Sequence, residues 1–224
     1  MGCFALSPLT IAVPKGRIAR ELMPLLSMAG IEAEPAFYDE HSRQLMFATQ
    51  HPHVRLVRVR SFDVATFVAF GGAQIGVCGS DVLMEFNYSE IYAPLHLNIG
   101  HCRLSLAAPS GVGAVGNGAS HVRVATKYPH LTANFFANKG IQAECVKLNG
   151  AMEIAPLLGL CHYIVDLVST GSTLKANGLE EVEIIADISS RLVVNRSASK
   201  TRSHEVHGWV AKFTDVCQQL SIRG

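Results

Sequence analysis

The chain has 224 residues, of which 49% are hydrophobic and 17% charged, and its formal net charge is +1. This length suits one large domain or two small ones, with enough apolar residues to bury a core. A charge so close to zero gives no overall field to attract nucleic acid or a membrane, so we expect neither as a partner, and local positive groups must hold any anionic ligand.

The first half of the chain alternates strand and helix patterns. Short apolar or alternating runs predict strands, and apolar residues at helical spacing predict helices that end near glycines. The predicted strands are 9–13, 55–59, 74–78 and 103–108, and the predicted helices are 18–29, 64–70 and 82–86. This order predicts a mostly parallel sheet covered by helices.

A glycine-rich loop at 109–120 leads to a second series of strands and helices. The predicted strands are 121–126, 143–148, 163–168, 182–186 and 191–194, and the predicted helices are 131–139, 154–160, one that starts at 174–176, and 207–220. Two such series predict an α/β protein with two lobes, and a cleft between lobes is the default place for a ligand.

The six cysteines indicate a reducing compartment. They show no CxxC spacing, and several lie in apolar runs, where cysteine behaves as a small hydrophobic residue. The N-terminal stretch MGCFALSPLTIAV lacks the basic start and long apolar core of a signal peptide, and no stretch is long and apolar enough for a membrane span. We therefore expect a cytoplasmic protein.

The stretch DLVSTGSTLKANG at 166–178 carries the strongest functional signal. Asp166 interrupts an apolar strand, and four hydroxyl residues surround Gly171 in the loop that follows. Ligands in open α/β sheets bind beyond the carboxyl ends of strands. Backbone N–H groups, hydroxyls and a helix N-terminus can cradle a phosphate, while Asp166 can accept hydrogen bonds from a sugar diol. The loop alone fits an ordinary turn and helix cap equally well.

A second candidate loop joins the first predicted strand to the first helix. There Lys15 and Arg17 flank Gly16. Arginine offers a fork of donors and lysine a point charge, so the pair suits a pyrophosphate or triphosphate. Solvated charges in a turn explain the same pattern equally well.

Three arginines lie on or beside the predicted strand 55–59. Alternation places Arg58 and Arg60 on one face, with Arg60 at the carboxyl end of the strand, where ligands bind. We expect Arg55 and Arg58 to be surface residues. The sequence has no nucleophile elbow, dinucleotide fingerprint or tight carboxylate pair, and its ten histidines lack metal-ligand spacing.

Several blocks of the sequence resemble the ATP phosphoribosyltransferase family, which catalyses the first step of histidine biosynthesis. The stretch at 166–178 resembles the family's phosphoribosyl-pyrophosphate (PRPP) loop. Further blocks follow in the family's order: LTIAVPKGRI at 9–18, RSFDVATFVAFGGAQIGVCGSDVL at 60–83, CRLSLA at 102–107, RVATKYP at 123–129, KLNGAMEIAPLLGL at 147–160 and SSRLVVNR at 189–196. Gln74 and Ser169 depart from the family's usual Asp and Glu, the loop 111–118 looks long, and residues 1–8 have no counterpart.

The resemblance implies a two-lobed α/β fold like that of type II periplasmic binding proteins, with the active site in the cleft. Lobe I is expected to contain residues 1–102 and 185–224, and lobe II residues 103–184 with the PRPP loop. The chain resembles the family's short form, which lacks a C-terminal regulatory domain. That form implies a homodimer of catalytic chains and a hetero-octamer with a regulatory subunit similar to histidyl-tRNA synthetase.

The implied reaction joins N1 of ATP to the anomeric carbon of PRPP and releases pyrophosphate. Mg²⁺ is expected to be carried by the substrate phosphates, without dedicated protein ligands. The residues expected to bind PRPP are Asp166, Ser169, Thr170, Gly171, Ser172, Thr173 and Glu153. Those expected to bind ATP are Lys15, Gly16, Arg17, Arg43 and Asp81. The expected catalytic residues are Arg60, Lys15 and Arg17.

Two alternatives to this transferase remain open at the level of the sequence. One is a non-catalytic small-anion binding module of the periplasmic-binding-protein fold. The other is a phosphoribosyltransferase that acts on another base, since a PRPP loop does not specify the acceptor.

Overall fold

The computed structural model describes residues 7–39, 41–116 and 118–223, and its chain divides into two compact units. Unit 1 contains the described residues up to Leu83, then Asn87–Gly100 and Ser189 onward, and unit 2 contains Met84–Phe86 and His101–Ile188. The units therefore divide after Gly100 and Ile188, close to the lobe boundaries that were expected after residues 102 and 184. Residues 1–6, part of the N-terminal segment without a counterpart, lie outside the described residues.

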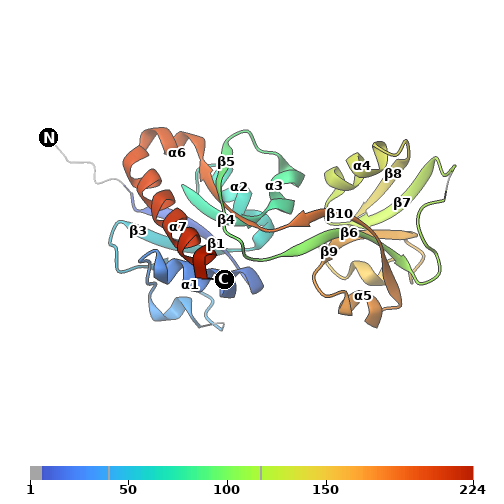
Figure 1. Cartoon of the computed structure of the whole chain (residues 1–224), viewed down its shortest axis with the longest axis horizontal. Helices are drawn as coiled ribbons and strands as arrows, with labels where there is room; N and C mark the ends of the chain where they lie inside the picture. Colours follow the sequence, from blue (N-terminus) through green and yellow to red (C-terminus); the bar gives the residue numbers. More distant parts are fainter. Residues whose placement is uncertain (1–6, 40, 117, 224) are drawn as a thin grey trace. The chain divides into compact units, whose positions relative to one another are not determined.

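Within its described residues, unit 1 is built on a six-stranded sheet in the order β2-β3-β1-β4-β11-β5 (Figure 1). Its strands are β1 (Leu9–Pro14), β2 (Met46–Ala48), β3 (Val54–Val59), β4 (Ile75–Gly79), β5 (Ile91–His96) and β11 (Ser190–Asn195). β1 pairs in parallel with β3 and β4, whereas β2, β11 and β5 run antiparallel to their neighbours. The expectation of a mostly parallel sheet is therefore wrong, because β11 returns from the far end of the sequence and the edge strands β2 and β5 were not predicted.

Helices cover both faces of this sheet. They are α1 (Arg17–Met28), α2 (Val64–Ala69), α3 (Ser80–Phe86), α6 (Arg196–Thr201) and α7 (Ser203–Arg223), with the short 3-10 helices η1 (Pro35–Phe37) and η2 (Ser61–Asp63). Leu22 of α1 and Phe213 of α7 belong to one apolar core with Ile75 of β4, and Figure 1 shows α7 returning beside α1 and β1. α2 packs on the other face, where its valines leave room for only a glycine at position 76 of β4.

The described part of unit 2 contains a five-stranded sheet in the order β10-β6-β9-β7-β8. Its strands are β6 (Cys102–Pro109), β7 (His121–Thr126), β8 (Gln142–Lys147), β9 (Tyr163–Val168) and β10 (Leu179–Ile188), and its helices are α4 (Pro129–Ala137), η3 (Met152–Ile154) and α5 (Ser172–Ala176). β7 pairs in parallel with both β8 and β9, whereas β6 is antiparallel to both β9 and β10. The helix expected at 154–160 is wrong: η3 ends at Ile154 and turns follow, because Pro156 lacks an N–H and Gly159 has a φ of 70°.

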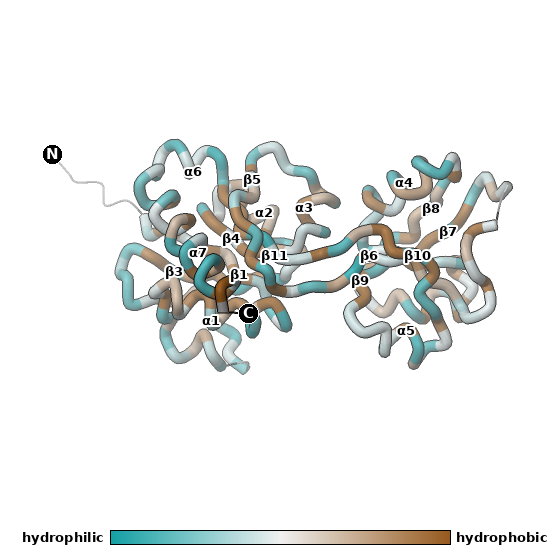
Figure 2. Tube along the Cα trace, in the orientation of Figure 1, coloured by the Kyte–Doolittle hydropathy of each residue, from teal (hydrophilic) through white to brown (hydrophobic). Residues whose placement is uncertain are grey.

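Apolar residues concentrate on the strands of each unit, as the brown segments at β7 in Figure 2 show, while α7 includes teal segments. Cys78 and Cys161 are buried free thiols in this interior. Among the residues that the structure describes, no helix is long and apolar enough to cross a membrane.

An ion pair ties β6 to β10 and makes the stability of unit 2 depend on pH. Arg103 donates from Nε and Nη2 to the two carboxylate oxygens of Glu181, at 3.0 and 2.7 Å. This hydrogen bonding lowers the pKa of Glu181 below its usual value of 4.5. A depressed folded-state pKa stabilises the fold above the unfolded value, and the contribution disappears as pH falls through the folded value.

We therefore expect Glu181→Gln to lower the urea midpoint of unfolding at pH 7, and this deficit to shrink progressively below pH 4.5. Urea titrations of both proteins between pH 3 and 8 measure the difference. Glu183→Gln is a matched control from the same strand, because Glu183 pairs with Lys139 at a more exposed position and should contribute little. A deficit that is equal at every pH would contradict the prediction.

Candidate functional site

The loop after β9 forms one wall of a cavity of about 170 Å³, here called the β9 pocket. Six of the seven residues expected to bind PRPP line it. The seventh, Ser172, is not among the lining residues. The lining residues are Ser105, Ala107, Glu153, Ile164, Asp166, Leu167, Val168, Ser169, Thr170, Gly171, Thr173 and Leu174. The structure thus brings Glu153, which is distant in sequence, to the loop at the end of β9.

The hydroxyls of this loop have separate roles. Thr170 Oγ1 and Ser172 Oγ form a hydrogen bond at 2.9 Å, and Ser172 N donates to Thr170 Oγ1 at 3.3 Å. These bonds fold the loop into a tight turn. Gly171, just before α5, has a φ of 77°, a backbone conformation that glycine adopts without steric strain. Thr173 and Ser169 are exposed, so their hydroxyls are available to a ligand.

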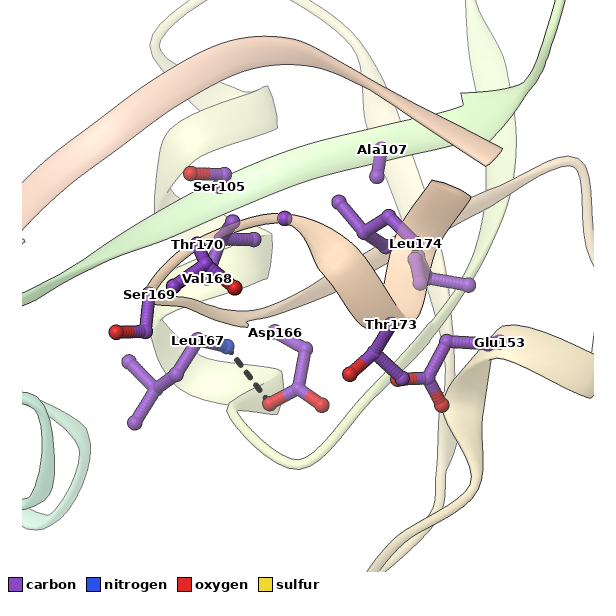
Figure 3. A pocket seen from close by; sticks show the side chains of 12 residues that line it. Ser105, Ala107, Glu153, Asp166, Leu167, Val168, Ser169, Thr170, Thr173 and Leu174 are labelled. Carbon is purple, nitrogen blue, oxygen red and sulfur yellow. Dashed lines mark hydrogen bonds between the residues drawn. The ribbon is translucent and has the colours of Figure 1, made fainter. Parts of the chain in front are cut away.

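Two carboxylates reach the same cavity. Figure 3 shows Asp166, Glu153 and the hydroxyl of Thr173 on one side of the loop. Asp166 is half-buried, and its Oδ1 accepts a hydrogen bond from Leu167 N at 2.8 Å, which fixes the carboxylate. Glu153 lies on η3, which follows Ala151 in the left-handed region at a φ of 52°. A strained backbone at this point is consistent with a functional need to place Glu153.

Ser105 is a pocket residue that the sequence did not reveal. It lies on β6 directly opposite Asp166 in the antiparallel register, is fully buried, and donates to Glu181 at 3.2 Å. Ser105 lies in the family-like block at 102–107, but no feature of that block marks it as a site residue, and the pairing of β6 with β9 is what places it opposite Asp166.

A second cavity of about 270 Å³ lies in unit 1 at the end of β1, and is here called the β1 pocket. Lys15 and Gly16, both expected at the nucleotide, line it. The complete lining is Pro14, Lys15, Gly16, Ala19, Arg20, Met23, Phe37, Tyr38, Ser42 and Arg58. Gly16 precedes α1 with a φ of 82°, so a glycine with a positive φ precedes the helix here, as at the β9 pocket, although the two glycines differ in ψ.

Two basic residues follow neighbouring strand ends in unit 1, and of these Lys15 lines the β1 pocket while Arg60 does not. Pro14 pairs with Val59, and Lys15 N donates to Val59 O at 3.0 Å, so Lys15 lies next to Arg60 across the parallel ladder. Both side chains are exposed. Arg17 lies in the first turn of α1, where it donates to Gly100 O at 3.4 Å and pairs with Glu21 at 3.7 Å. It is absent from the pocket lining.

Two further residues expected to bind ATP, Arg43 and Asp81, do not line the β1 pocket. Arg43 is exposed and follows Ser42, which lines the β1 pocket. Asp81 is 4% exposed, and its carboxylate packs so closely on Gly79 that a Cβ there would lie 2.0 Å from Oδ1. Burial, and then the Asp81 carboxylate, raise the pKa of the Cys78 thiol. Asp81 therefore belongs to the interior at the start of α3 and lines neither pocket.

The arrangement favours ligands that carry phosphates and a sugar. The β9 pocket combines hydroxyls, loop N–H groups and two carboxylates, and the β1 pocket combines cations with an aromatic wall. Within the described residues, no group of three or more His, Cys, Asp or Glu side chains is arranged to hold a metal ion.

Comparisons with known proteins agree on one family. The family model described as "HisG: ATP phosphoribosyltransferase" matches residues 60–215. The ATP phosphoribosyltransferase of Paramagnetospirillum magneticum is 63% identical over 211 residues, covering 93% of this chain and 96% of that protein. A solved ATP phosphoribosyl transferase (HisG:HisZ) complex from Thermotoga maritima has a TM-score of 0.79 and 34% identity, covering 94% of this chain and 99% of that chain.

A more distant structure shares the fold alone. The periplasmic aliphatic sulphonate binding protein SsuA from Escherichia coli aligns with a TM-score of 0.58 at 10% identity, covering 98% of this chain and 71% of that chain. The two mixed sheets are therefore those of the periplasmic-binding-protein fold, as expected from the sequence.

Proposed function

This chain belongs to the ATP phosphoribosyltransferase family, and from that premise we propose that its β9 pocket binds PRPP and its β1 pocket binds ATP. An enzyme of this family catalyses the first step of histidine biosynthesis. The phosphoribosyl group of PRPP is transferred to N1 of ATP, and pyrophosphate leaves.

One observation carries the PRPP assignment: the loop 169–173 and two carboxylates line the same cavity. The loop N–H groups and the hydroxyls of Ser169 and Thr173 suit the 5-phosphate, for which the small side chains leave space. Asp166 and Glu153 suit the ribose hydroxyls, because carboxylates accept hydrogen bonds from a diol. Thr170 and Ser172 contribute by holding the turn.

The proposed chemistry needs alignment and charge stabilisation rather than a protein nucleophile. Positive charge develops on the ribose ring near Asp166 and Glu153, while negative charge develops on the departing pyrophosphate. We assign Lys15 and Arg60, neighbours across the β1-β3 ladder, to that negative charge, and Arg17 and Arg43 to the phosphates of ATP. Mg²⁺, which prefers oxygen ligands and phosphates, would reduce the charge on pyrophosphate when the substrates carry it in. Asp81 is not part of this proposal, because it is buried and lines neither pocket.

The two alternatives are less well supported. A small-anion binding module needs a single ligand pocket, whereas each unit here has its own polar pocket with a positive-φ glycine before a helix. A transferase for another base would keep the β9 pocket, but the match of residues 60–215 to the family favours ATP as acceptor.

We also propose a regulatory partner and a cellular location. The related Thermotoga maritima protein was solved as a HisG:HisZ complex, which supports a complex with a second kind of subunit. The finer form that we propose, from the resemblance to the family's short form, is a hetero-octamer of catalytic homodimers with a histidyl-tRNA synthetase-like subunit. The buried free thiols Cys78 and Cys161 fit the reducing cytoplasm.

Pyrophosphate release on mixing the protein with ATP, PRPP and Mg²⁺ tests the proposed function. We expect release only when both substrates are present, with the chain alone and with its regulatory partner. Replacing ATP with free adenine or another base is the control for acceptor identity. Release with another base and not with ATP would support the second alternative, and binding of anions without any release would support the first.

A further inference from the structure

Arg58 is the residue of the β1 pocket that departs furthest from its sequence-based expectation. It was expected on the surface, but it is half-buried and lines the pocket. Its Nη2 donates to Phe37 O at 2.5 Å and to Ala36 O at 3.3 Å, and its Nη1 lies 3.4 Å from Asp39 O. One guanidinium therefore binds three carbonyls of a single turn.

The same guanidinium packs against two buried aromatic rings. Its central carbon lies 4.5 Å from the centre of the Phe47 ring and 5.3 Å from that of Phe37, within the range of cation–π attraction. Phe37 and Phe47 contact each other edge to face, with centroids 5.2 Å apart. Arg58 thus links β3 to the segment 36–39 by both hydrogen bonds and ring contacts.

That segment forms the aromatic wall of the pocket. Phe37 and Tyr38 both line the cavity, and Tyr38 is 46% exposed. The segment makes a tight turn, in which Tyr38 N donates to Pro35 O at 3.0 Å. Carbonyls that point inward from such a turn need donors, and the planar fork of arginine can serve several at once, which the compact lysine head cannot.

We propose that Arg58 is a positioning residue for the nucleotide: it fixes the segment 36–39 so that Phe37 and Tyr38 form a preorganised wall for the ATP ring system. The inference rests on the proposed binding of ATP in the β1 pocket. A preformed wall reduces the loss of freedom on binding, so its effect falls on affinity for ATP.

The first test compares Arg58→Met with Arg55→Met by measuring the KM of each substrate. Methionine keeps much of the apolar stem but has no donors. Arg55 is the matched control, because it lies on the same strand and donates to Thr10 Oγ1 at 2.8 Å outside the β1 pocket. We expect Arg58→Met to raise the KM for ATP by roughly tenfold or more and to leave the KM for PRPP within about twofold. Arg55→Met should change neither.

A double-mutant cycle with Tyr38→Ala distinguishes positioning from direct contact with phosphate. If Arg58 acts through the wall, Arg58→Met should add less than about twofold once Tyr38 is removed. Arg58→Lys keeps the charge without the fork, so it should retain most of the defect, and it carries the test if the methionine variant does not fold. Full additivity, or complete rescue by lysine, would overturn the positioning role.

Tyr38→Ala separates this inference from the proposed function, because Tyr38 lines the β1 pocket itself. If Tyr38→Ala raises the KM for ATP and Arg58→Met does not, the role of Arg58 is wrong and the pocket assignment stands. If neither variant changes the KM for ATP, the pocket assignment itself is wrong, and the inference is overturned with it.

Discussion

Replacing Thr170 and Thr173 together with alanine is expected to raise the KM for PRPP on the order of 100-fold, while the KM for ATP changes far less. Thr173 places its hydroxyl in the β9 pocket beside Glu153 (Figure 3), and the Thr170 hydroxyl holds the turn through Ser172. The double variant would therefore remove one proposed contact with PRPP and loosen the loop whose N–H groups we assign to the 5-phosphate.

The control for this variant removes two threonine hydroxyls that line neither the β9 pocket nor the β1 pocket. Thr201 Oγ1 donates to Ser197 O and Thr214 Oγ1 to Val210 O, each within its own helix. Thr201→Ala with Thr214→Ala should leave both KM values unchanged. Initial-rate kinetics with one substrate varied at a time separate the two constants. An unaltered KM for PRPP in the Thr170 and Thr173 variant would refute the assignment of the loop to the 5-phosphate.

The strands that the sequence predicts best are short apolar runs between clear turn signals. β7 and β9 begin and end at the predicted residues. β9 is a nearly continuous apolar run, whereas β7 starts with exposed and buried residues in alternation, and both patterns are typical of strands. β5 was missed because it is an edge strand with mixed exposure and contains Pro94, which removes a ladder donor. β2 has three residues, too few for a periodic pattern.

The two pockets differ in how much of them local sequence can reveal. The β9 pocket depends mainly on contiguous residues, so the motif at 166–178 exposes most of its polar groups. The β1 pocket joins the loop after β1 to the turn at η1 and to Arg58 of β3. Alternation along β3 correctly assigns Arg58 to a face, but it does not say that the segment 36–39 covers that face. That information exists only in the tertiary contacts.

Arg60→Ala is expected to lower kcat on the order of 100- to 1000-fold with smaller changes in both KM values. Arg60 is exposed at the end of β3, and its backbone, whose carbonyl accepts from Asp63 N at 2.9 Å, starts η2 without help from the side chain. Alanine therefore removes the charge and leaves the fold intact. A charge that acts on the departing pyrophosphate is needed more in the transition state than in the ground state, so its loss appears in kcat.

The neighbouring Lys15 allows this interpretation to be tested further. Because Lys15 lies beside Arg60 across the β1-β3 ladder, both cations can act on one pyrophosphate, and their removal should then be less than additive in log kcat. Arg55→Ala on the same strand is the control and should leave kcat unchanged, since its guanidinium bonds to Thr10. Single-turnover rates for the two single variants, the double variant and the control measure the coupling. A wild-type kcat in Arg60→Ala would remove Arg60 from the catalytic set, and strict additivity would mean that the two cations act on separate charges.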